Sequence, residues 1–339
     1  MNLAELTTLR LGGPAGQILE TVTEQQLVDA VMIADEAGDP PLIVAGGSNL
    51  VIADEGVPGT VILVRTPGIS VDADACSGAM VTVQAGENWD AFVAHAIGQG
   101  WAGIEALSGI PGSVGATPIQ NVGAYGQDVS QTIAGVRTYD RFDIKIRTFA
   151  AADCGFSYRH SRFKAEPHRY VVLSVTFQFA LADLGAPVAY AELARALGVQ
   201  VGDRAPAKAV RDAVLGLRKA KGMVLDAEDH DTWSAGSFFT NPLLSPEAAA
   251  ALPAGAPRYD QPDGTVKTSA AWLIEHAGFS KGYGTGPAQL STKHTLALTN
   301  RGEATTADLL GLAREIRTGV EAKFGITLVN EPVLVGCDF

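Results

Sequence analysis

The chain has 339 residues, of which 47% are hydrophobic and 18% charged, a balance typical of a folded globular protein and not of a disordered chain. Its formal net charge of −12 argues against a general nucleic-acid binder and against a membrane-surface protein, since both need basic surfaces. The length allows two or three domains.

The N-terminal residues and the cysteines predict a cytoplasmic protein. The opening MNLAELTTLRLGG lacks the basic flank and apolar core of a signal peptide, and no apolar run approaches the ~18 residues of a membrane span. Cys76, Cys154 and Cys337 are odd in number and far apart, so we expect neither a disulfide framework nor a zinc or other metal site.

Periodic apolar residues predict both helices and strands along the chain. We expect helices over residues 21–38, 88–100, 187–198, 207–219, 269–278 and 305–324. We expect strands over residues 41–45, 61–64, 80–84, 135–139, 145–149, 170–179, 296–298, 326–329 and 333–335. Residues 68–74 resemble a turn and mark a candidate subdomain boundary.

Residues 110–126, IPGSVGATPIQNVGAYG, form the most unusual stretch because glycine and proline recur in it too often for a helix or a central strand. Glycine lets a backbone approach a ligand closely, and proline holds the intervening segment in one shape. The pattern indicates a stiff, bare loop whose N–H groups converge on a flat or anionic group. A tightly packed connection without a ligand is the alternative.

A second bare stretch, Gly46-Gly47-Ser48-Asn49-Leu50, follows the predicted strand at residues 41–45. Such a loop can wrap main-chain donors around a phosphate. It is not the Rossmann fingerprint, because G-x-G-x-x-G is absent and the apolar Val51 and Ile52 follow in place of a helix. The loop is therefore expected to link two strands.

These two loops, in this order, resemble the flavin-binding half of the UDP-N-acetylenolpyruvoylglucosamine reductases, and the resemblance extends from about residue 8 to about residue 336. That family belongs to the p-cresol-methylhydroxylase/vanillyl-alcohol-oxidase (PCMH/VAO) flavoproteins. The resemblance implies non-covalent FAD, NADPH as co-substrate, and reduction of the UDP-sugar enolpyruvyl ether UDP-N-acetylglucosamine enolpyruvate to UDP-N-acetylmuramate for peptidoglycan precursors. Covalent relatives tether FAD through histidine or cysteine, and neither residue flanks the two loops.

The resemblance also assigns residues to FAD, all of them in the two bare loops. These are Gly46, Gly47, Ser48, Asn49, Leu50, Pro111, Gly112, Ser113, Gly115, Ala116, Gln120, Asn121, Gly123, Ala124 and Tyr125.

Three residues match the family's catalytic positions. Arg159 lies in a Y-R-x-S-x-F-K-like segment that could otherwise be a solvated basic loop; its planar guanidinium suits a carboxylate or a flavin carbonyl. Ser237 lies in Gly236-Ser237-Phe238-Phe239-Thr240-Asn241-Pro242, where the family has its proton donor, although a hydrogen-bonded strand serine is the alternative. Glu331 keeps the family's catalytic glutamate, whereas Asn330 and Pro332 depart from its usual L-E-P-E-V form.

Five further residues match substrate positions of the family. They are Tyr158, Tyr190 on a loop that closes over the substrate, Lys221 in an R-x-x-K segment that could also be a plain helix end, Asn241, and His294, for which an exposed turn is the alternative.

The resemblance implies an α+β fold with a two-lobed PCMH/VAO-type FAD-binding region and a C-terminal α+β substrate-binding domain. We place lobe 1 at residues 1–68, joined by the C-terminal strands at 327–339, lobe 2 at 69–214 and the substrate-binding domain at 215–326. We expect no nucleic-acid, membrane or obligatory protein partner. The competing interpretations are another flavin oxidase of the superfamily and a nucleotide-sugar-binding protein without flavin.

Overall fold

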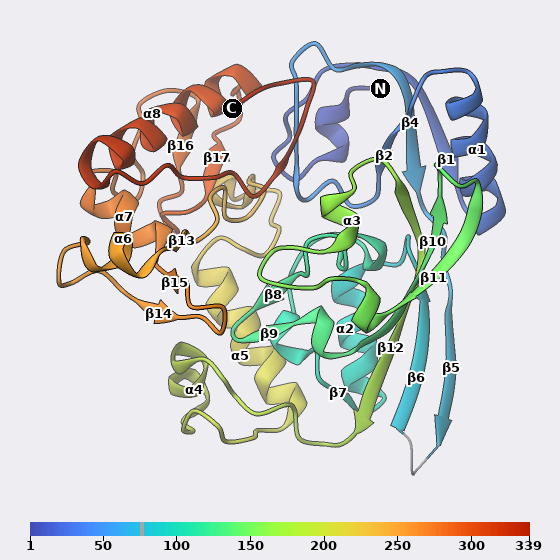
Figure 1. The fold of residues 1–339 in the computed structure, drawn as a ribbon, viewed down its shortest axis with the longest axis horizontal. Helices are drawn as coiled ribbons and strands as arrows, with labels where there is room; N and C mark the ends of the chain where they lie inside the picture. Colours follow the sequence, from blue (N-terminus) through green and yellow to red (C-terminus); the bar gives the residue numbers. More distant parts are fainter. Residues whose placement is uncertain (75–77) are drawn as a thin grey trace. The chain divides into compact units, whose positions relative to one another are not determined.

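The computed structural model describes residues 1–74 and 78–339 and mixes helices and strands, so the predicted α+β class is confirmed (Figure 1). Cys76 lies outside the described residues. The chain divides into two compact units, each built from separate segments. Unit 1 contains Met1–Pro14, Gly47–Val57 and Lys221–Phe339, and unit 2 contains Ala15–Gly46 and Pro58–Ala220. The predicted three-part division of the chain stays a prediction.

A six-stranded sheet organises unit 2. Its main path runs β11 (Lys145–Ala150), β10 (Ile133–Asp140), β12 (Tyr170–Leu181), β6 (Gly78–Gln84) and β5 (Ile69–Asp74), with neighbours antiparallel, and β7 (Trp101–Ala102) pairs with the end of β12. Helix α2 (Trp89–Gly98) begins after Asn88, whose side chain accepts the Ala91 N–H as expected of an N-cap. It covers one face of the sheet (Figure 1), where Phe92 lies 5.3 Å from Phe177 between ring centroids.

A smaller sheet of unit 2 has the order β1 (Ala15–Thr21), β4 (Val57–Val64) and β2 (Leu42–Val44), with β2 and β4 parallel. Helix α1 (Glu24–Glu36) buries Leu27 and Val31 in a cluster that includes Ile62 and Val64 of β4. Burying these side chains is worth roughly 1.5–3 kcal/mol each.

The remainder of unit 2 carries the predicted flavin loop and a helical hairpin. The hairpin consists of α4 (Ala191–Leu197) and α5 (Ala207–Ala220), joined through Gly198 in the left-handed conformation. The short elements are η2 (Glu105–Leu107), η3 (Val114–Ala116), β8 (Gly123–Ala124), β9 (Gln127–Asp128), η4 (Val129–Gln131), η5 (Ala151–Asp153) and α3 (Arg162–Ala165).

Unit 1 is built around two helices and two small strand pairs. Helix α8 (Thr306–Phe324) starts with a capping box at Thr305, ends at Gly325 in the left-handed conformation, and shares a buried core with α7 (Ala270–His276). Strand β16 (Ala288–Leu290) pairs with β17 (Leu298–Asn300), and β18 (Val333–Val335) pairs in parallel with β3 (Leu50–Ile52). The short elements are η1 (Leu3–Leu6), η6 (His230–Thr232), β13 (Leu243–Leu244), α6 (Pro246–Ala250), β14 (Tyr259–Asp260) and β15 (Val266–Lys267).

Five local expectations are wrong. Residues 68–74 are mainly strand β5, an edge strand whose Ile69 and Val71 are 36% and 49% exposed, so the usual burial signal is weak. Residues 326–329 form no strand, because their segment meets its neighbour through the single bridge between Asn330 and Phe239. Residues 21–23 precede α1, since Thr21 ends β1 and Thr23 caps the helix. Residues 187–190 likewise precede α4, whose N-cap is Tyr190. The strand expected at residues 296–298 is β17, which begins only at Leu298.

No helix in the described part of the chain is both long and apolar enough to cross a membrane. Within the same residues, no group of three or more histidine, cysteine, aspartate or glutamate side chains could hold a metal ion. Cys154 and Cys337 are free thiols, and burial raises the pKa of Cys154 to about 11. That thiol is therefore neutral and a poor nucleophile near pH 7.

Candidate active site

Unit 1 brings the segments of two predicted catalytic residues side by side. The Glu331 N–H donates to the Phe238 carbonyl at 2.8 Å, and Phe239 forms a bridge with Asn330. Phe238 and Phe239 are each 1% exposed, whereas Ser237 and Glu331 are half-buried. Two buried aromatic side chains thus fix the backbone that carries Ser237, and a short main-chain pairing fixes Glu331 beside it.

The predicted phosphate loop is tied to the Glu331 segment within unit 1. Val333 N–H donates to the Asn49 carbonyl at 2.9 Å, and Asn49 Nδ2 donates to the Glu331 carbonyl at 3.5 Å. Asn330 Nδ2 donates to the Pro332 carbonyl at 2.8 Å. This hydrogen bond spans Glu331 and holds the local backbone where the chain departs from the family's L-E-P-E-V form.

Thr8 is a residue of this site that sequence reasoning missed. Its N–H donates to the Gly47 carbonyl at 3.3 Å, and its Oγ1 donates to the Ser234 carbonyl at 2.7 Å, three residues before Ser237. Gly47 itself has φ +58°, and a Cβ there would lie 1.8 Å from the Leu6 carbonyl oxygen. Thr8 thus connects the phosphate loop to the Ser237 segment. Its acceptors are main-chain carbonyls, which every residue has, so no sequence motif marks these hydrogen bonds.

The other predicted substrate residues of unit 1 lie at turns and helix ends. Lys221 directly follows α5, as the plain helix-end interpretation also expects. Asn241 Oδ1 accepts the Ala270 N–H at the start of α7 at 3.0 Å. His294 lies in a turn whose Leu296 carbonyl accepts the Phe238 N–H at 2.7 Å, next to the Ser237 segment.

In unit 2, the predicted flavin loop and the loop that carries Arg159 are joined by side chain–backbone hydrogen bonds. Arg159 Nη2 donates to the Gly123 carbonyl at 3.0 Å, and Asn121 Nδ2 donates to the Ser157 carbonyl at 3.2 Å. Ser161 Oγ donates to the Ile119 carbonyl at 2.5 Å. These bonds fix the Arg159 guanidinium against the flavin loop.

Three residues of these two loops have left-handed backbone conformations: Asn121 at φ +47°, Tyr125 at φ +50° and Arg159 at φ +53°. Such conformations are uncommon outside glycine, each costs of order 1–3 kcal/mol, and they cluster at functional sites where the surroundings hold them. Asn121 is 3% exposed, and its Oδ1 also accepts the Ser130 N–H at 3.1 Å.

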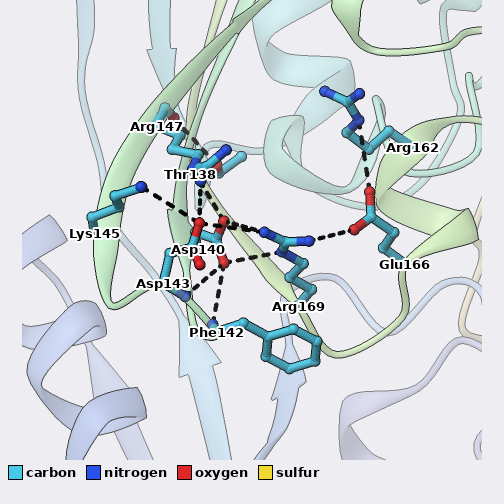
Figure 2. Close-up of polar contacts among 9 residues, drawn as sticks. All are labelled: Thr138, Asp140, Phe142, Asp143, Lys145, Arg147, Arg162, Glu166 and Arg169. Atoms are coloured by element: carbon cyan, nitrogen blue, oxygen red, sulfur yellow. Dashed lines mark hydrogen bonds and ion pairs between the residues drawn. The ribbon is translucent and has the colours of Figure 1, made fainter.

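A buried ion cluster supports the chain just after Arg159 (Figure 2). Asp140, fully buried, accepts hydrogen bonds from Arg169 at 3.1 and 3.0 Å and pairs with Arg147 at 3.1 Å. Burial alone would raise the pKa of Asp140, but the hydrogen bonds from Arg169 and from two backbone amides hold it below the usual range. Arg169 also pairs with Glu166 at 2.8 Å, which holds the end of α3.

Tyr125 and Tyr190 meet edge to face in unit 2, with ring centroids 5.7 Å apart. Burial raises the pKa of Tyr125 to about 12, so its phenol is neutral at physiological pH. Tyr190 is 47% exposed and stands at the N-cap of α4, and Tyr158 is 36% exposed with the Arg159 guanidinium 5.7 Å from its ring centroid.

Comparison with known proteins decides the family. The chain is 59% identical to UDP-N-acetylenolpyruvoylglucosamine reductase of Streptomyces avermitilis over 99% of its own length and 94% of the relative's. It is 57% identical to the reductase of the same name from Cutibacterium acnes, over 99% and 89% of the two chains. The chain belongs to the UDP-N-acetylenolpyruvoylglucosamine reductase family.

Domain models and a solved structure agree with this family assignment. Residues 15–142 match an FAD binding domain, and residues 228–335 match the C-terminal domain of UDP-N-acetylenolpyruvoylglucosamine reductase. The crystal structure of the reductase from Thermus caldophilus superimposes with a TM-score of 0.67 at 24% identity, over 99% of this chain and 97% of that one, and shows the shared fold. The chain is thus an FAD-dependent oxidoreductase of this family.

The predicted flavin loops of this reductase-family chain fit FAD. Gly46 and Gly112 meet so closely that a Cβ on Gly46 would lie 2.5 Å from the Gly112 Cα, so the cradle tolerates no side chain there. The hydroxyl of Ser113, a residue 4% exposed, has no hydrogen-bond partner among the described residues, and a cofactor hydroxyl or phosphate can supply one. The Val114 and Gly115 amides are used internally, donating to the Glu87 and Ala85 carbonyls at 2.9 Å.

Proposed function

We propose that the chain reduces UDP-N-acetylglucosamine enolpyruvate to UDP-N-acetylmuramate, with NADPH as the reductant and FAD as the cofactor, in the formation of peptidoglycan precursors. The observation that supports the proposal is the main-chain pairing of the segments that carry Ser237 and Glu331, both of them half-buried residues. The identity of 59% to a reductase of this name supports the substrate.

FAD would be held non-covalently by the two bare loops, with Ser113 as a polar contact and the close approach of Gly46 and Gly112 leaving no side chain in the way. When bound, FAD would supply the hydride chemistry that links NADPH to C3 of the enolpyruvyl ether. The chain's own residues bind the substrate, stabilise charge and supply the proton.

Ser237 would donate the proton to C2 of the enolpyruvyl group after hydride has arrived at C3. Arg159 would stabilise the enolate that develops at the substrate carboxylate, because a guanidinium keeps its charge and its hydrogen bond to the Gly123 carbonyl pre-organises it. Glu331 would stabilise the same charge, as a hydrogen-bond donor in its protonated form.

Substrate binding falls to Tyr158, Tyr190, Lys221, Asn241 and His294 in this proposal. A chain with a net charge of −12 needs local positive charge to bind a diphosphate, and Lys221 is the lysine that matches the family position. The enzyme would act in the cytoplasm without an obligatory protein partner.

The test is an anaerobic titration of the purified holoenzyme. NADPH should bleach the flavin absorbance, and the enolpyruvyl nucleotide should restore it with formation of one equivalent of UDP-N-acetylmuramate. Purified protein that stays colourless and takes up no FAD would favour a nucleotide-sugar-binding protein. Reduced flavin that reacts with oxygen but not with the enolpyruvyl nucleotide would favour another flavin oxidase.

A further inference from the structure

Glu105 is a buried carboxylate that the proposed reaction does not use. The residue is 0% exposed and lies in η2, only five residues before the flavin loop begins at residue 110. A buried carboxylate is costly unless it is paired or hydrogen-bonded. Its partners therefore show what the fold uses it for.

Both oxygens of the Glu105 carboxylate accept backbone amides. Oε2 accepts the Gly103 N–H at 2.7 Å, within its own turn. Oε1 accepts the Ala186 N–H, from a segment 81 residues further along the chain. A Cβ on Gly185 would lie 2.4 Å from Oε1, so this glycine lets the segment approach the carboxylate. Glu105 thus joins the turn before the flavin loop to the segment that leads into Tyr190.

The segment held by Glu105 is fixed to the α4–α5 hairpin. Gly185 N–H donates to the Ala205 carbonyl at 2.9 Å, and Val188 N–H donates to the Asp203 carbonyl at 2.8 Å. Val188 is 3% exposed and belongs to a buried cluster with Ala106, the neighbour of Glu105. Since these bonds extend to Val188, Tyr190 does not stand on a long free loop, and its place depends on the hairpin as a whole.

The hairpin touches the flavin loop where Tyr125 meets Tyr190 and where a Cβ on Gly126 would lie 2.7 Å from Ala189 Cβ. The Ala106 N–H also donates to Gln127 Oε1 at 2.8 Å, which fixes the end of the flavin loop to the Glu105 turn. We propose that Glu105 is a positioning residue that seats the Tyr190 hairpin against the flavin loop and so sets substrate affinity through Tyr190. The proposal rests on the proposed function, in which Tyr190 binds the UDP-sugar.

The test combines Glu105→Gln with Tyr190→Ala in the full-length holoenzyme. Glutamine keeps the shape of the Glu105 side chain, but its NH2 group replaces one carboxylate oxygen. That group cannot accept a hydrogen bond from the backbone N–H that it faces. Losing such a charge-assisted bond should raise the KM for the enolpyruvyl nucleotide about tenfold. Flavin reduction by NADPH should stay near wild type. In the Tyr190→Ala background the same substitution should change KM by less than about twofold, because a residue that acts only through Tyr190 has no effect once that side chain is removed.

A matched control is Asp140→Asn, another fully buried carboxylate of unit 2, whose partners are Arg169, Arg147 and two amides of its own turn. Asp140→Asn should act independently of Tyr190, so the fold-change in KM of the double variant should equal the product of the two single fold-changes. If the fold-change in KM of the Glu105→Gln/Tyr190→Ala double variant also equalled the product of the single fold-changes, the proposal would be overturned.

Amide hydrogen exchange gives a readout that does not need turnover. Glu105→Gln should speed exchange in peptides covering residues 183–190, and leave peptides from α1 unchanged. Unchanged exchange at residues 183–190 would overturn the proposal. A wild-type enzyme that binds FAD but does not reduce the enolpyruvyl nucleotide would refute the proposed function instead, and the exchange rates would then decide the role of Glu105 by themselves.

Discussion

Ser237 combines a weakly acidic hydroxyl with a fixed, half-buried position between Gly236 and the buried Phe238. If it protonates C2 only after hydride arrives, Ser237→Ala should leave FAD binding and flavin reduction by NADPH near wild type. Reoxidation of the flavin by the enolpyruvyl nucleotide should slow by at least ~10²–10⁴-fold, the usual contribution of a general acid. Stopped-flow absorbance of the two half-reactions measures both rates.

Two further variants separate chemistry from packing at this segment. Ser237→Cys should recover part of the lost rate, because a thiol can donate a proton from the same place. Thr240→Val removes a hydroxyl that donates to the Val329 carbonyl at 3.4 Å in the same segment, and should leave the reoxidation rate unchanged. A Ser237→Ala enzyme whose reduced flavin is reoxidised by substrate at the wild-type rate would end the proton-donor interpretation.

The sequence offers Ser237 and Glu331 as candidates but not Thr8 or Glu105, and the difference has a physical reason. Ser237 lies in a motif of unusual composition, and Glu331 follows a family pattern. Thr8 and Glu105 act through hydrogen bonds to main-chain groups 39 or more positions away, as to the Gly47 carbonyl and the Ala186 amide. Any residue can present a main-chain partner, so only the fold shows which one is used.

Between elements, Asn121 makes the connection that the proposed site depends on most. Its side chain holds both the Arg159 loop, through the Ser157 carbonyl, and the Ser130 amide, while its own backbone is left-handed. Asn121→Gly should weaken FAD binding by up to about thirtyfold, since glycine keeps the backbone conformation but loses two part-buried hydrogen bonds worth roughly 1 kcal/mol each. Titration of apoprotein with FAD, followed by quenching of flavin fluorescence, measures the dissociation constant.

Asn121→Ala adds backbone strain to the same loss and should bind FAD no better than the glycine variant. The control is Thr23→Ala, which removes the N-cap of α1 and should lower the free energy of unfolding by about 1 kcal/mol without changing FAD affinity. If Asn121→Gly bound FAD as tightly as wild type, the connection between the two loops would have no bearing on the cofactor.

Helices and strands whose apolar residues recur with a regular period could be predicted from the sequence. Strands that form only because a distant segment pairs with them could not. Helix α8 has a buried stripe through Leu309, Ile316 and Val320 with matching caps, so its prediction at residues 305–324 agrees closely with the structure. Strand β5 lacked such a signal because it is an edge strand with exposed apolar residues. The pairing of β18 with β3 spans some 280 residues, and no local pattern in the sequence encodes it.

For the molecule as a whole, bound FAD should act as a stabilising ligand that is not covalently attached. Acid or heat precipitation should release all the flavin into the supernatant, measured by its absorbance. Because a ligand that binds only the folded state stabilises it by mass action, holoenzyme at a thousandfold excess over Kd should gain about 4 kcal/mol over apoprotein. Flavin that stays with the precipitated protein would show a covalent link and contradict the proposed function.

Acid stability follows from the carboxylates whose pKa values the fold holds down. Asp140 of unit 2 and Asp231 of unit 1 both have lowered pKa values, Asp140 through Arg169 and Asp231 through Thr292 and Arg301, in each case against the opposing effect of burial. A lowered folded-state pKa contributes stability that is present above the unfolded value of about 3.9 and is lost as the pH falls through the folded value. Both units should therefore lose stability in acid below about pH 4.

Asp140→Asn isolates this effect, because the substitution leaves Arg147 and Arg169 in place without the charge that they surround (Figure 2). The free energy of unfolding should fall on the order of 3 kcal/mol at pH 7, as for other broken buried pairs. The difference in free energy of unfolding from wild type should hold between about pH 5 and 7. It should narrow as the pH falls from about 4 towards the lowered pKa of Asp140, because there the unfolded wild-type chain binds a proton that the folded chain does not. Urea unfolding across this pH range measures this difference, with Asp72→Asn, at an exposed position of β5, as a control expected to change little. A gap of constant width down to about pH 2 would mean that Asp140 contributes through shape and hydrogen bonding alone, and not through its charge.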